Sequence, residues 1–330
     1  MIQFHRRILR FFLLVLLGLS LTVLPSCVTV QAEPLEAIRL DYATYNPVSL
    51  VLKEKGWMEE EFAKDNIKVQ CALSLGSHKA IQLLNSTVVD FASTAGGSSL
   101  IARSKNSLIK GIYIYSKPEW TALVTTANSP ITQVSDLRGK RIAAALGTDA
   151  YIFLIRSLNE FGLKPEDVTI LQMQQSQGKA ALEQGTVDAW AGLDPYMAET
   201  EVQEGSRLFF RNPDFCTYGM LNVREDFAQQ YPDYIERVLK VYEKARLWSM
   251  DHPDELRNIL ARDARLKGAI AAKQIERTDL SNPKLTQDVE ETLKAAGEVL
   301  QESGIIPSSL DLEASVHSLV NSQFVEKMAT

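Results

Sequence analysis

The sequence predicts an α/β protein made of two lobes. From Ile38 onward, short apolar strand patterns alternate with helical patterns, which is typical of a parallel or mixed sheet covered by helices. About 300 of the 330 residues remain once an N-terminal export signal is set aside, more than one core usually fills. From Pro232 the pattern becomes almost entirely helical, so we expect a helical C-terminal coat over the sheets.

The first residues have the features of a secretory signal. Basic residues, among them Arg6 and Arg7, precede an apolar run from Phe11 to Leu24, and small, turn-prone residues follow it. This run is shorter than the roughly 20 residues that span a bilayer. We therefore expect residues 1–32 to be a signal peptide and the mature chain to act outside the cytoplasmic membrane.

Two processing routes fit this signal. Leu24-Pro25-Ser26-Cys27 resembles a bacterial lipobox, in which Cys27 becomes the lipidated first residue, although proline at its second position is atypical. Val30-Gln31-Ala32 fits an ordinary small-x-small cleavage site before Glu33. The sequence leaves open whether the mature protein is free in the periplasm or anchored to a membrane through Cys27.

Charge and cysteine content exclude several classes of function. The chain carries 35 basic and 41 acidic residues, a net charge of −6, and no basic block dense enough to indicate nucleic acid. Cys71 and Cys216 are far apart in sequence, so we expect two buried, unpaired thiols. The four histidines have no metal-ligand spacing, and we expect neither a metal nor another cofactor.

The alternation of strands and helices divides into two similar series. Each contains a helix end, a turn and a strand of the same shape, at residues 84–90 and again at residues 182–188. We expect one lobe from residues 33–124 and 223–330 and the other from residues 125–222. The expected strands are 38–43, 67–73, 88–93, 109–115, 121–126, 141–145, 168–173, 187–191 and 208–210, and the expected C-terminal helices are 234–250, 253–262, 286–304 and 312–324.

Helix starts supply the first candidate binding residues. Open α/β sheets bind ligands at the carboxyl ends of their strands, where helix N-termini present free backbone N–H groups that hold anions. Asn46 before Pro47 and Ser77 have the features of helix caps, and Gly147-Thr148-Asp149 opens a helix that Gly162 ends. Thr94 to Ser98 is expected to be a flexible turn before a helix over 99–103. Ordinary capping also explains each of these segments, but the small residues of Thr94 to Gly97 and of Gly147-Thr148 favour a binding role, because they let a ligand approach the backbone closely.

Aromatic and acidic residues add a second group of candidates. Trp120 and Trp190 each follow or end a predicted strand, one in each lobe, so they could close over an apolar tail from opposite sides. Core packing explains them equally well. Glu119 and Asp194 would repel an anionic head group but could meet an amino group. No nucleophile or phosphate-binding motif is present, so we do not expect an enzyme.

Several stretches together resemble a known family. They run in order from about Ile38 to Phe324 and are similar to the aliphatic sulfonate, nitrate and taurine family of periplasmic binding proteins, most of all to its sulfonate-binding branch. The stretches are residues 45–57, 89–96, 116–123, 147–151, 187–195 and 217–225, among them Val187-Asp188-Ala189-Trp190-Ala191-Gly192-Leu193-Asp194-Pro195.

The resemblance implies a two-lobed type II periplasmic binding protein fold with two hinge crossings that closes on its ligand. It also implies a monomer that delivers a small organic anion, such as an aliphatic sulfonate, to the permease and ATPase of an ABC importer. Taurine, nitrate, bicarbonate or a pyrimidine precursor remain alternative ligands, and a non-transport sensor lipoprotein or an enzyme similar to pyrimidine synthases remain alternative roles. The residues implied to face the cleft are Asn46, Ser93, Thr94, Gly96, Glu119, Trp120, Thr148, Asp149, Trp190, Asp194 and Tyr218.

Overall fold

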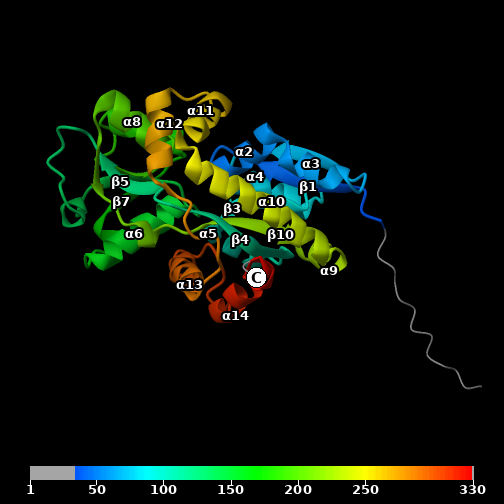
Figure 1. Ribbon diagram of the computed structural model, residues 1–330. Coiled ribbons are helices and arrows are strands. Elements are labelled where there is room, and N and C mark those ends of the chain that lie inside the picture. Colours follow the sequence, from blue (N-terminus) through cyan, green and yellow to red (C-terminus); the bar gives the residue numbers. More distant parts are fainter. Residues whose placement is uncertain (1–33, 329–330) are drawn as a thin grey trace, which may run out of the picture. The chain divides into compact units, whose positions relative to one another are not determined.

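Two separate sheets organise the computed structural model, which describes residues 34–328 (Figure 1). Both belong to one compact unit that starts at Leu35. The predicted signal peptide and Cys27 lie outside the described residues. The strands are β1 (Ala37–Tyr42), β2 (Lys68–Leu73), β3 (Phe91–Ala95), β4 (Ile109–Pro118), β5 (Thr121–Thr125), β6 (Arg141–Ala144), β7 (Thr169–Gln172), β8 (Ala189–Leu193), β9 (Arg207–Phe210), β10 (Gly219–Arg224) and β11 (Thr278–Asp279).

The same strand arrangement occurs in both sheets. The first has the order β11-β4-β10-β3-β1-β2 and the second the order β7-β6-β8-β5-β9. In the first, β1 pairs in parallel with β2 and β3, and β10 then pairs antiparallel with β3. In the second, β6 pairs in parallel with β7 and β8, and β5 pairs antiparallel with β8. The two predicted series therefore fold alike.

The chain passes from the first sheet to the second between β4 and β5, and returns between β9 and β10. Strand β5 pairs in the second sheet and β10 in the first, whereas the predicted lobe bounds place Thr121 to Val124 in the first lobe and Gly219 to Asn222 in the second. We therefore propose lobe boundaries at residues 119–120 and near residue 218 instead of at 124 and 222.

Helices cover the first sheet on both faces. Helix α10 packs against α2 and α3 on one face, while α13 and α14 pack against α5 on the other (Figure 1). The helices are α2 (Pro47–Lys55), α3 (Trp57–Ala63), α4 (Ser77–Asn85), α5 (Gly96–Ser104), α6 (Asp149–Glu160), α7 (Gln175–Glu183), α8 (Tyr196–Glu204), α9 (Glu225–Gln230), α10 (Pro232–Asp251), α11 (Pro253–Asp263), α12 (Gly268–Glu276), α13 (Gln287–Glu302), α14 (Leu312–Leu319) and α15 (Gln323–Lys327).

The predicted helix over 312–324 is two helices, α14 and α15. Between them Val320 forms a β-bridge with Gly111, and the Asn321 N–H donates to the Gly111 carbonyl at 2.9 Å. Pairing with the edge of a strand therefore interrupts the helical pattern. Helix α12 was not predicted from the sequence.

The structure confirms some of the predicted helix ends and contradicts one of them. Asn46 caps α2 as predicted, because its Oδ1 accepts from the Ser49 N–H at 3.3 Å, and Gly162 follows α6 with φ of 68°. Ser77, by contrast, is the first residue of α4, and Gly76 holds the cap position. The Ser77 hydroxyl instead accepts from the Ala95 N–H at 2.9 Å, which ties α4 to the end of β3.

The predicted flexible turn at residues 94–98 is absent, because β3 runs to Ala95 and α5 begins at Gly96. A Cβ at Gly96 would lie 2.8 Å from Cδ2 of Leu293, and one at Gly97 would lie 2.8 Å from Cδ1 of Ile152 on α6. These glycines therefore permit close packing of helices from both sheets around the start of α5, not a turn.

A separate small core fills the second sheet on the side of α7. Trp190 is 1% exposed and packs with Val124, Leu182 and Met197, among other apolar residues. A Cβ at Gly178 of α7 would lie 2.6 Å from the Trp190 ring. The indole therefore serves as the centre of this core, with the helix pressed against it.

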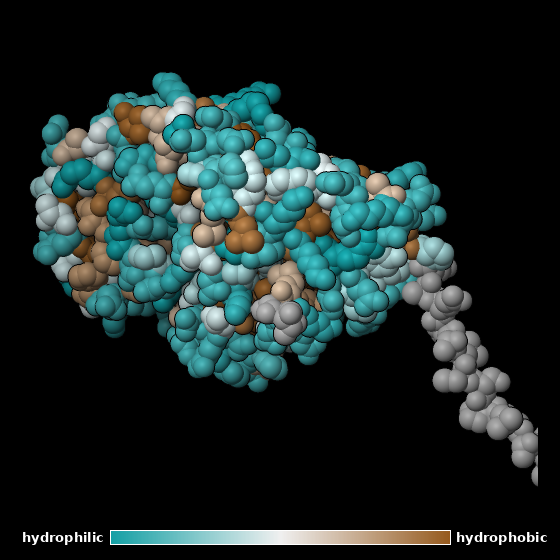
Figure 2. Space-filling model, in the orientation of Figure 1, coloured by the Kyte–Doolittle hydropathy of each residue, from teal (hydrophilic) through white to brown (hydrophobic). Residues whose placement is uncertain are grey.

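The face drawn in Figure 2 is mainly hydrophilic, with groups of apolar residues between hydrophilic ones. Within residues 34–328, no helix combines the length and the apolar character that crossing a membrane requires. Both cysteines of this part of the chain are free; Cys216 is buried, as expected, whereas Cys71 is exposed and so differs from the prediction.

The packing of α7 on Trp190 gives a test of the fold. We expect Gly178→Ala to lower the free energy of unfolding by about 1–3 kcal/mol, because the added methyl group meets a rigid ring. Gly268→Ala is the control, since no atom lies within 4 Å of the added Cβ at that helix start. Urea unfolding should leave the control unchanged or slightly more stable; equal effects of the two substitutions would contradict the described packing.

Candidate ligand-binding site

A small cavity lies where the two sheets meet. Its walls come from the segment between β1 and α2, the β4–β5 crossing, the end of β8 and the end of α12, and its volume is about 20 Å³. A cavity of this size holds about one water molecule. The residues that line it are Tyr45, Pro118, Trp120, Asp194, Gln274, Arg277 and Thr278. Trp120 and Asp194 are thus two predicted residues that the structure brings together.

Arg277 is the cation of this cavity. Its Nη1 lies 3.1 Å from Oδ1 and 3.2 Å from Oδ2 of Asp194, and its Nη2 contacts Glu201. The Arg277 and Asp194 side chains are 4% and 3% exposed. Burial raises the pKa of Asp194, and the nearby guanidinium opposes that shift. Two carboxylates share one guanidinium, so this group of three side chains carries excess negative charge.

Glu119 is turned away from the cavity. Arg211 holds it with two parallel hydrogen bonds, from Nε to Oε1 at 2.7 Å and from Nη2 to Oε2 at 2.6 Å. The Glu119 N–H donates to the Arg277 carbonyl at 2.7 Å. Its charge is therefore neutralised locally, and its backbone positions Arg277.

Asp149 fixes the Trp120 ring beside the cavity. The indole Nε1 donates to Oδ2 of Asp149 at 2.9 Å, and the Thr217 hydroxyl donates to the same oxygen at 2.7 Å. That hydroxyl also accepts from the Gly97 N–H at 3.1 Å, at the start of α5. Burial raises the pKa of Asp149, while these hydrogen bonds act in the opposite direction. The carboxylate thus links the first turns of α5 and α6.

A second buried carboxylate supports the wall formed by Tyr45. Asp41, at the end of β1, accepts from the N–H and the hydroxyl of Ser93, both at 2.9 Å, and from the hydroxyl of Ser74. The Tyr45 hydroxyl donates to the Ser93 carbonyl at 2.8 Å, and Asn46 Nδ2 donates to Oγ of Ser93 at 2.8 Å. Asp41 is fully buried, and burial raises its pKa to about 7.

Ser93 and Asn46 are therefore bound within the hydrogen-bond network of Asp41 and do not line the cavity. Tyr45 is the member of the network that reaches it. Asp41 is not among the residues predicted from the sequence to face the cleft, because nothing in the sequence marks a strand aspartate as buried. Tyr45 was a candidate only together with Asn46, as part of a helix start.

Five further predicted residues lie outside the lining of the cavity: Thr94, Gly96, Thr148, Trp190 and Tyr218. Thr94 accepts from Asn222 Nδ2 at 2.8 Å within the first sheet. The Thr148 hydroxyl donates to the Ala145 carbonyl at 2.6 Å, and the Tyr218 carbonyl accepts from the Gly96 N–H at 2.9 Å. Trp190 is the core residue described above. In the described structure the contacts of these five residues are ones of packing and backbone support, and their part in ligand binding stays a prediction.

Five residues of the cavity lining are absent from the predicted site residues: Tyr45, Pro118, Gln274, Arg277 and Thr278. Gln274 and Arg277 are the two that matter most here. Both depend on α12, whose cap Lys267 makes no side-chain hydrogen bond, so no capping signal marked the helix. The run Ala269-Ile270-Ala271-Ala272 consists largely of residues with good helix propensity and was the one available signal.

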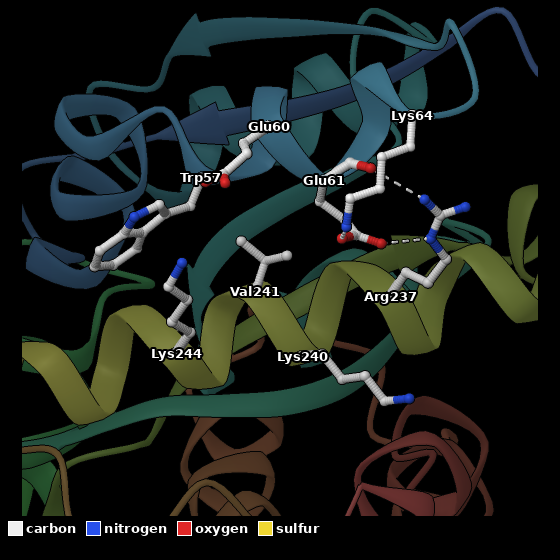
Figure 3. Close-up of a pocket in the computed structure, with 8 residues that line it drawn as sticks. All are labelled: Trp57, Glu60, Glu61, Lys64, Arg237, Lys240, Val241 and Lys244. Atoms are coloured by element: carbon white, nitrogen blue, oxygen red, sulfur yellow. Dashed lines mark hydrogen bonds and ion pairs between the residues drawn. The ribbon is translucent and has the colours of Figure 1, made fainter.

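A larger groove of about 390 Å³ lies between α3 and α10 (Figure 3). Its lining is mainly charged, and much of that charge is paired within the chain: Arg237 Nε donates to Oε1 of Glu61 at 2.9 Å, and Lys64 lies 2.7 Å from the other oxygen. Lys244 lies 4.3 Å from the centre of the Trp57 ring. This groove is lined by helices of the first sheet only, whereas the smaller cavity is lined by residues next to both sheets. Within residues 34–328, no cluster of three or more His, Cys, Asp or Glu side chains could hold a metal.

Comparison with known proteins identifies the family. The family model described as NMT1/THI5 like matches residues 47–256. The chain belongs to this family. A Bacillus subtilis (strain 168) protein, provisionally named an aliphatic sulfonates-binding protein, is 28% identical over 299 residues, which cover 89% of each chain.

Solved structures resemble this NMT1/THI5 like chain over most of its length. The periplasmic aliphatic sulphonate binding protein SsuA from Escherichia coli has a TM-score of 0.80 at 22% identity, covering 87% of this chain and 92% of that one. The alkanesulfonate-binding protein SsuA from Xanthomonas axonopodis pv. citri, bound to MOPS, has a TM-score of 0.75 at 20% identity, covering 88% and 99%. These likenesses confirm the predicted two-lobed periplasmic binding protein fold.

The buried Asp41 predicts an unusual dependence of stability on pH. In the unfolded chain this carboxyl ionises near pH 4, whereas in the folded chain it stays protonated up to about pH 7. Folding therefore takes up a proton between these values, and the stabilising contribution of Asp41 falls as pH rises from about 4 to 7. We expect Asp41→Asn to be at least about 1 kcal/mol more destabilising at pH 5 than at pH 8 in urea unfolding.

Asp254→Asn is the surface control, since its side chain is 83% exposed and pairs only with Arg257 of the same helix among the ion pairs of the described residues. Its effect should be small at both pH values. If Asp41→Asn changed the free energy of unfolding equally at pH 5 and pH 8, the inference that Asp41 is protonated in the folded chain would be wrong.

Proposed function

We propose that this protein is the extracytoplasmic solute-binding component of an ABC importer, and that it binds an aliphatic sulfonate between its two lobes. The observation that carries the proposal is the buried Arg277 in a cavity walled by residues of both sheets. The similarity to proteins named for sulfonate binding supports the same ligand class.

The residues of the cavity suit a sulfonate with a short carbon chain. A guanidinium offers a planar fork of N–H donors that can bind two oxygens of a sulfonate, as it does with carboxylate and phosphate. Trp120 and Pro118 provide apolar surface for the carbon chain. In this proposal the sulfonate takes the place of one carboxylate on Arg277.

The size of the cavity requires the lobes to move. A volume of about 20 Å³ is too small for a sulfonate, so entry requires the two lobes to separate at the two crossings and close again around the ligand. Ligand-driven closure needs contacts from both lobes, because a ligand shifts an equilibrium only by its differential affinity for the two states.

The same proposal covers location and partners. Export by the N-terminal signal would place the mature chain in the periplasm, either free or anchored through Cys27, where it would work as a monomer. Its partners would be the permease and the ATPase of the importer. A sensor that binds the same solute without transport is the second role, and genes for a permease and an ATPase beside this one would favour import.

We further propose that binding occurs without turnover of the ligand. The seven residues that line the cavity include no histidine, cysteine, serine or lysine that could serve as nucleophile or general base. The two carboxylates nearest the cation are held by Arg277.

Ligand binding by the mature chain, residues 33–330, tests the proposal directly. We expect alkanesulfonates and substituted sulfonates, as a class, to give a saturable change in tryptophan fluorescence and a higher melting temperature, because a ligand that binds only the folded state stabilises it. Nitrate, bicarbonate and a pyrimidine precursor should give neither. Mass spectrometry should recover the sulfonate unchanged. Response to one of the other solutes alone, or to none, would overturn the sulfonate assignment.

Arg277 should be the main determinant of affinity. We expect Arg277→Lys, which keeps the charge but loses the planar fork, to weaken sulfonate binding at least about tenfold in calorimetry. Arg211→Lys is the matched control, because Arg211 pairs with Glu119 outside the cavity lining. It should change affinity less than about threefold. Equal losses in both variants would contradict the role of Arg277.

A further inference from the structure

The amide of Gln274 leaves one hydrogen-bonding atom without a partner beside the cavity. Gln274 lies in the last turn of α12, lines the cavity and is 8% exposed. Its Nε2 donates to the Thr44 carbonyl at 3.1 Å. Its Oε1 is buried and has no hydrogen-bond partner among the described residues.

The orientation of this amide follows from its neighbour. The Thr44 carbonyl is an acceptor only, so the amide must turn its NH₂ group toward Thr44. The oxygen then occupies the other branch of the amide, where a donor is needed, because a buried acceptor left unpaired is costly.

The other cavity residues do not supply that donor. Three donors of the lining are directed at acceptors of the chain: the Tyr45 hydroxyl at the Ser93 carbonyl, Trp120 Nε1 at Asp149, and the Arg277 guanidinium at Asp194 and Glu201. The Thr278 hydroxyl donates to the Gln274 carbonyl at 2.8 Å. Within the described residues Oε1 therefore has no donor, and a group that enters the cavity, either a water molecule or a donor group of the ligand that displaces it, can supply one.

Local charge favours the same kind of ligand. Asp194 and Glu201 together outweigh the single charge of Arg277. A simple alkanesulfonate would add another negative charge here, whereas a sulfonate with an ammonium group at its other end would bring a compensating positive one. A hydroxyl group would supply the donor without the charge.

We propose that Gln274 determines specificity: its Oε1 accepts a hydrogen bond from an amino or hydroxyl group at the end of the ligand remote from the sulfonate. This inference rests on the proposed function and narrows it, because it assigns short, donor-bearing sulfonates as the preferred ligands over simple alkanesulfonates. A site that hydrogen-bonds a ligand group rejects the analogue lacking it far more strongly than apolar contact alone does.

Three ligands with the same two-carbon chain test the inference by calorimetry: ethanesulfonate, 2-hydroxyethanesulfonate and 2-aminoethanesulfonate. We expect at least one of the two donor-bearing ligands to bind the wild-type chain at least about tenfold more tightly than ethanesulfonate. In Gln274→Leu this preference should fall below about threefold, with ethanesulfonate bound within about threefold of wild type.

Controls separate specificity from folding. Gln287→Leu changes an exposed glutamine at the start of α13 and should keep the wild-type preference. Gln274→Glu keeps an acceptor at this position and should keep the preference for 2-aminoethanesulfonate. Thermal melting of each variant without ligand checks that it is folded.

Two outcomes would overturn the inference while leaving the proposed function intact: ethanesulfonate binding as tightly as its donor-bearing analogues, or a preference that survives in Gln274→Leu. If the wild-type chain binds no sulfonate at all, the proposed function itself fails, and the inference fails with it.

Discussion

The buried contact of Arg277 with Asp194 and Glu201 is the interaction on which the arrangement of the cavity depends. Removing a guanidinium and two carboxylates from water is expensive, and breaking such a group by removing one member leaves a buried charge without a partner. The group joins the end of α12 to the end of β8 and to α8. It therefore connects the C-terminal coat of the first sheet with the second sheet beside the cavity. The same guanidinium is the group to which we propose that the anion binds, so the cost of burying it serves ligand binding.

Two further contacts restrain the same region. Gly97 allows the first turn of α5 to approach Ile152 of α6. The Thr217 hydroxyl accepts from the Gly97 N–H and donates to the carboxylate of Asp149. That carboxylate in turn holds the Trp120 indole. The N-terminal ends of two helices thus meet around a carboxylate of the chain itself, and the Gly97 N–H at the start of α5 is satisfied by the Thr217 hydroxyl instead of being free to bind an external anion. This explains why the predicted helix starts contribute structure here while the cavity itself is lined by other side chains.

The sequence predicted the fold well because strand and helix periodicity are local properties. The starts of α2 and α6 were readable, since Asn46 with Pro47, and Gly147 before Asp149, have recognisable roles at helix ends. Within the site, Trp120 and Asp194 were found because they follow strand ends. For Trp190 the sequence left a cleft position and core packing equally open, because a tryptophan in a strand buried on both faces has the same local pattern as one that faces a cleft; the structure places it in a core. Gln274 and Arg277 could not be found, because they reach the cavity only through the tertiary position of α12.

The path of the chain through the two sheets has a consequence for how the protein is made. The second sheet is built from one continuous segment, β5 to β9, whereas β10, which lies between β3 and β4 at the centre of the first sheet, comes from residues 219–224 (Figure 1). Until those residues emerge, β3 and β4 have no strand to join them. A chain delivered from its N-terminus can therefore complete its second lobe while the first still has an open seam, with unpaired strand edges of the kind that favour aggregation. The first lobe, whose strands are made first, is therefore the last to be completed.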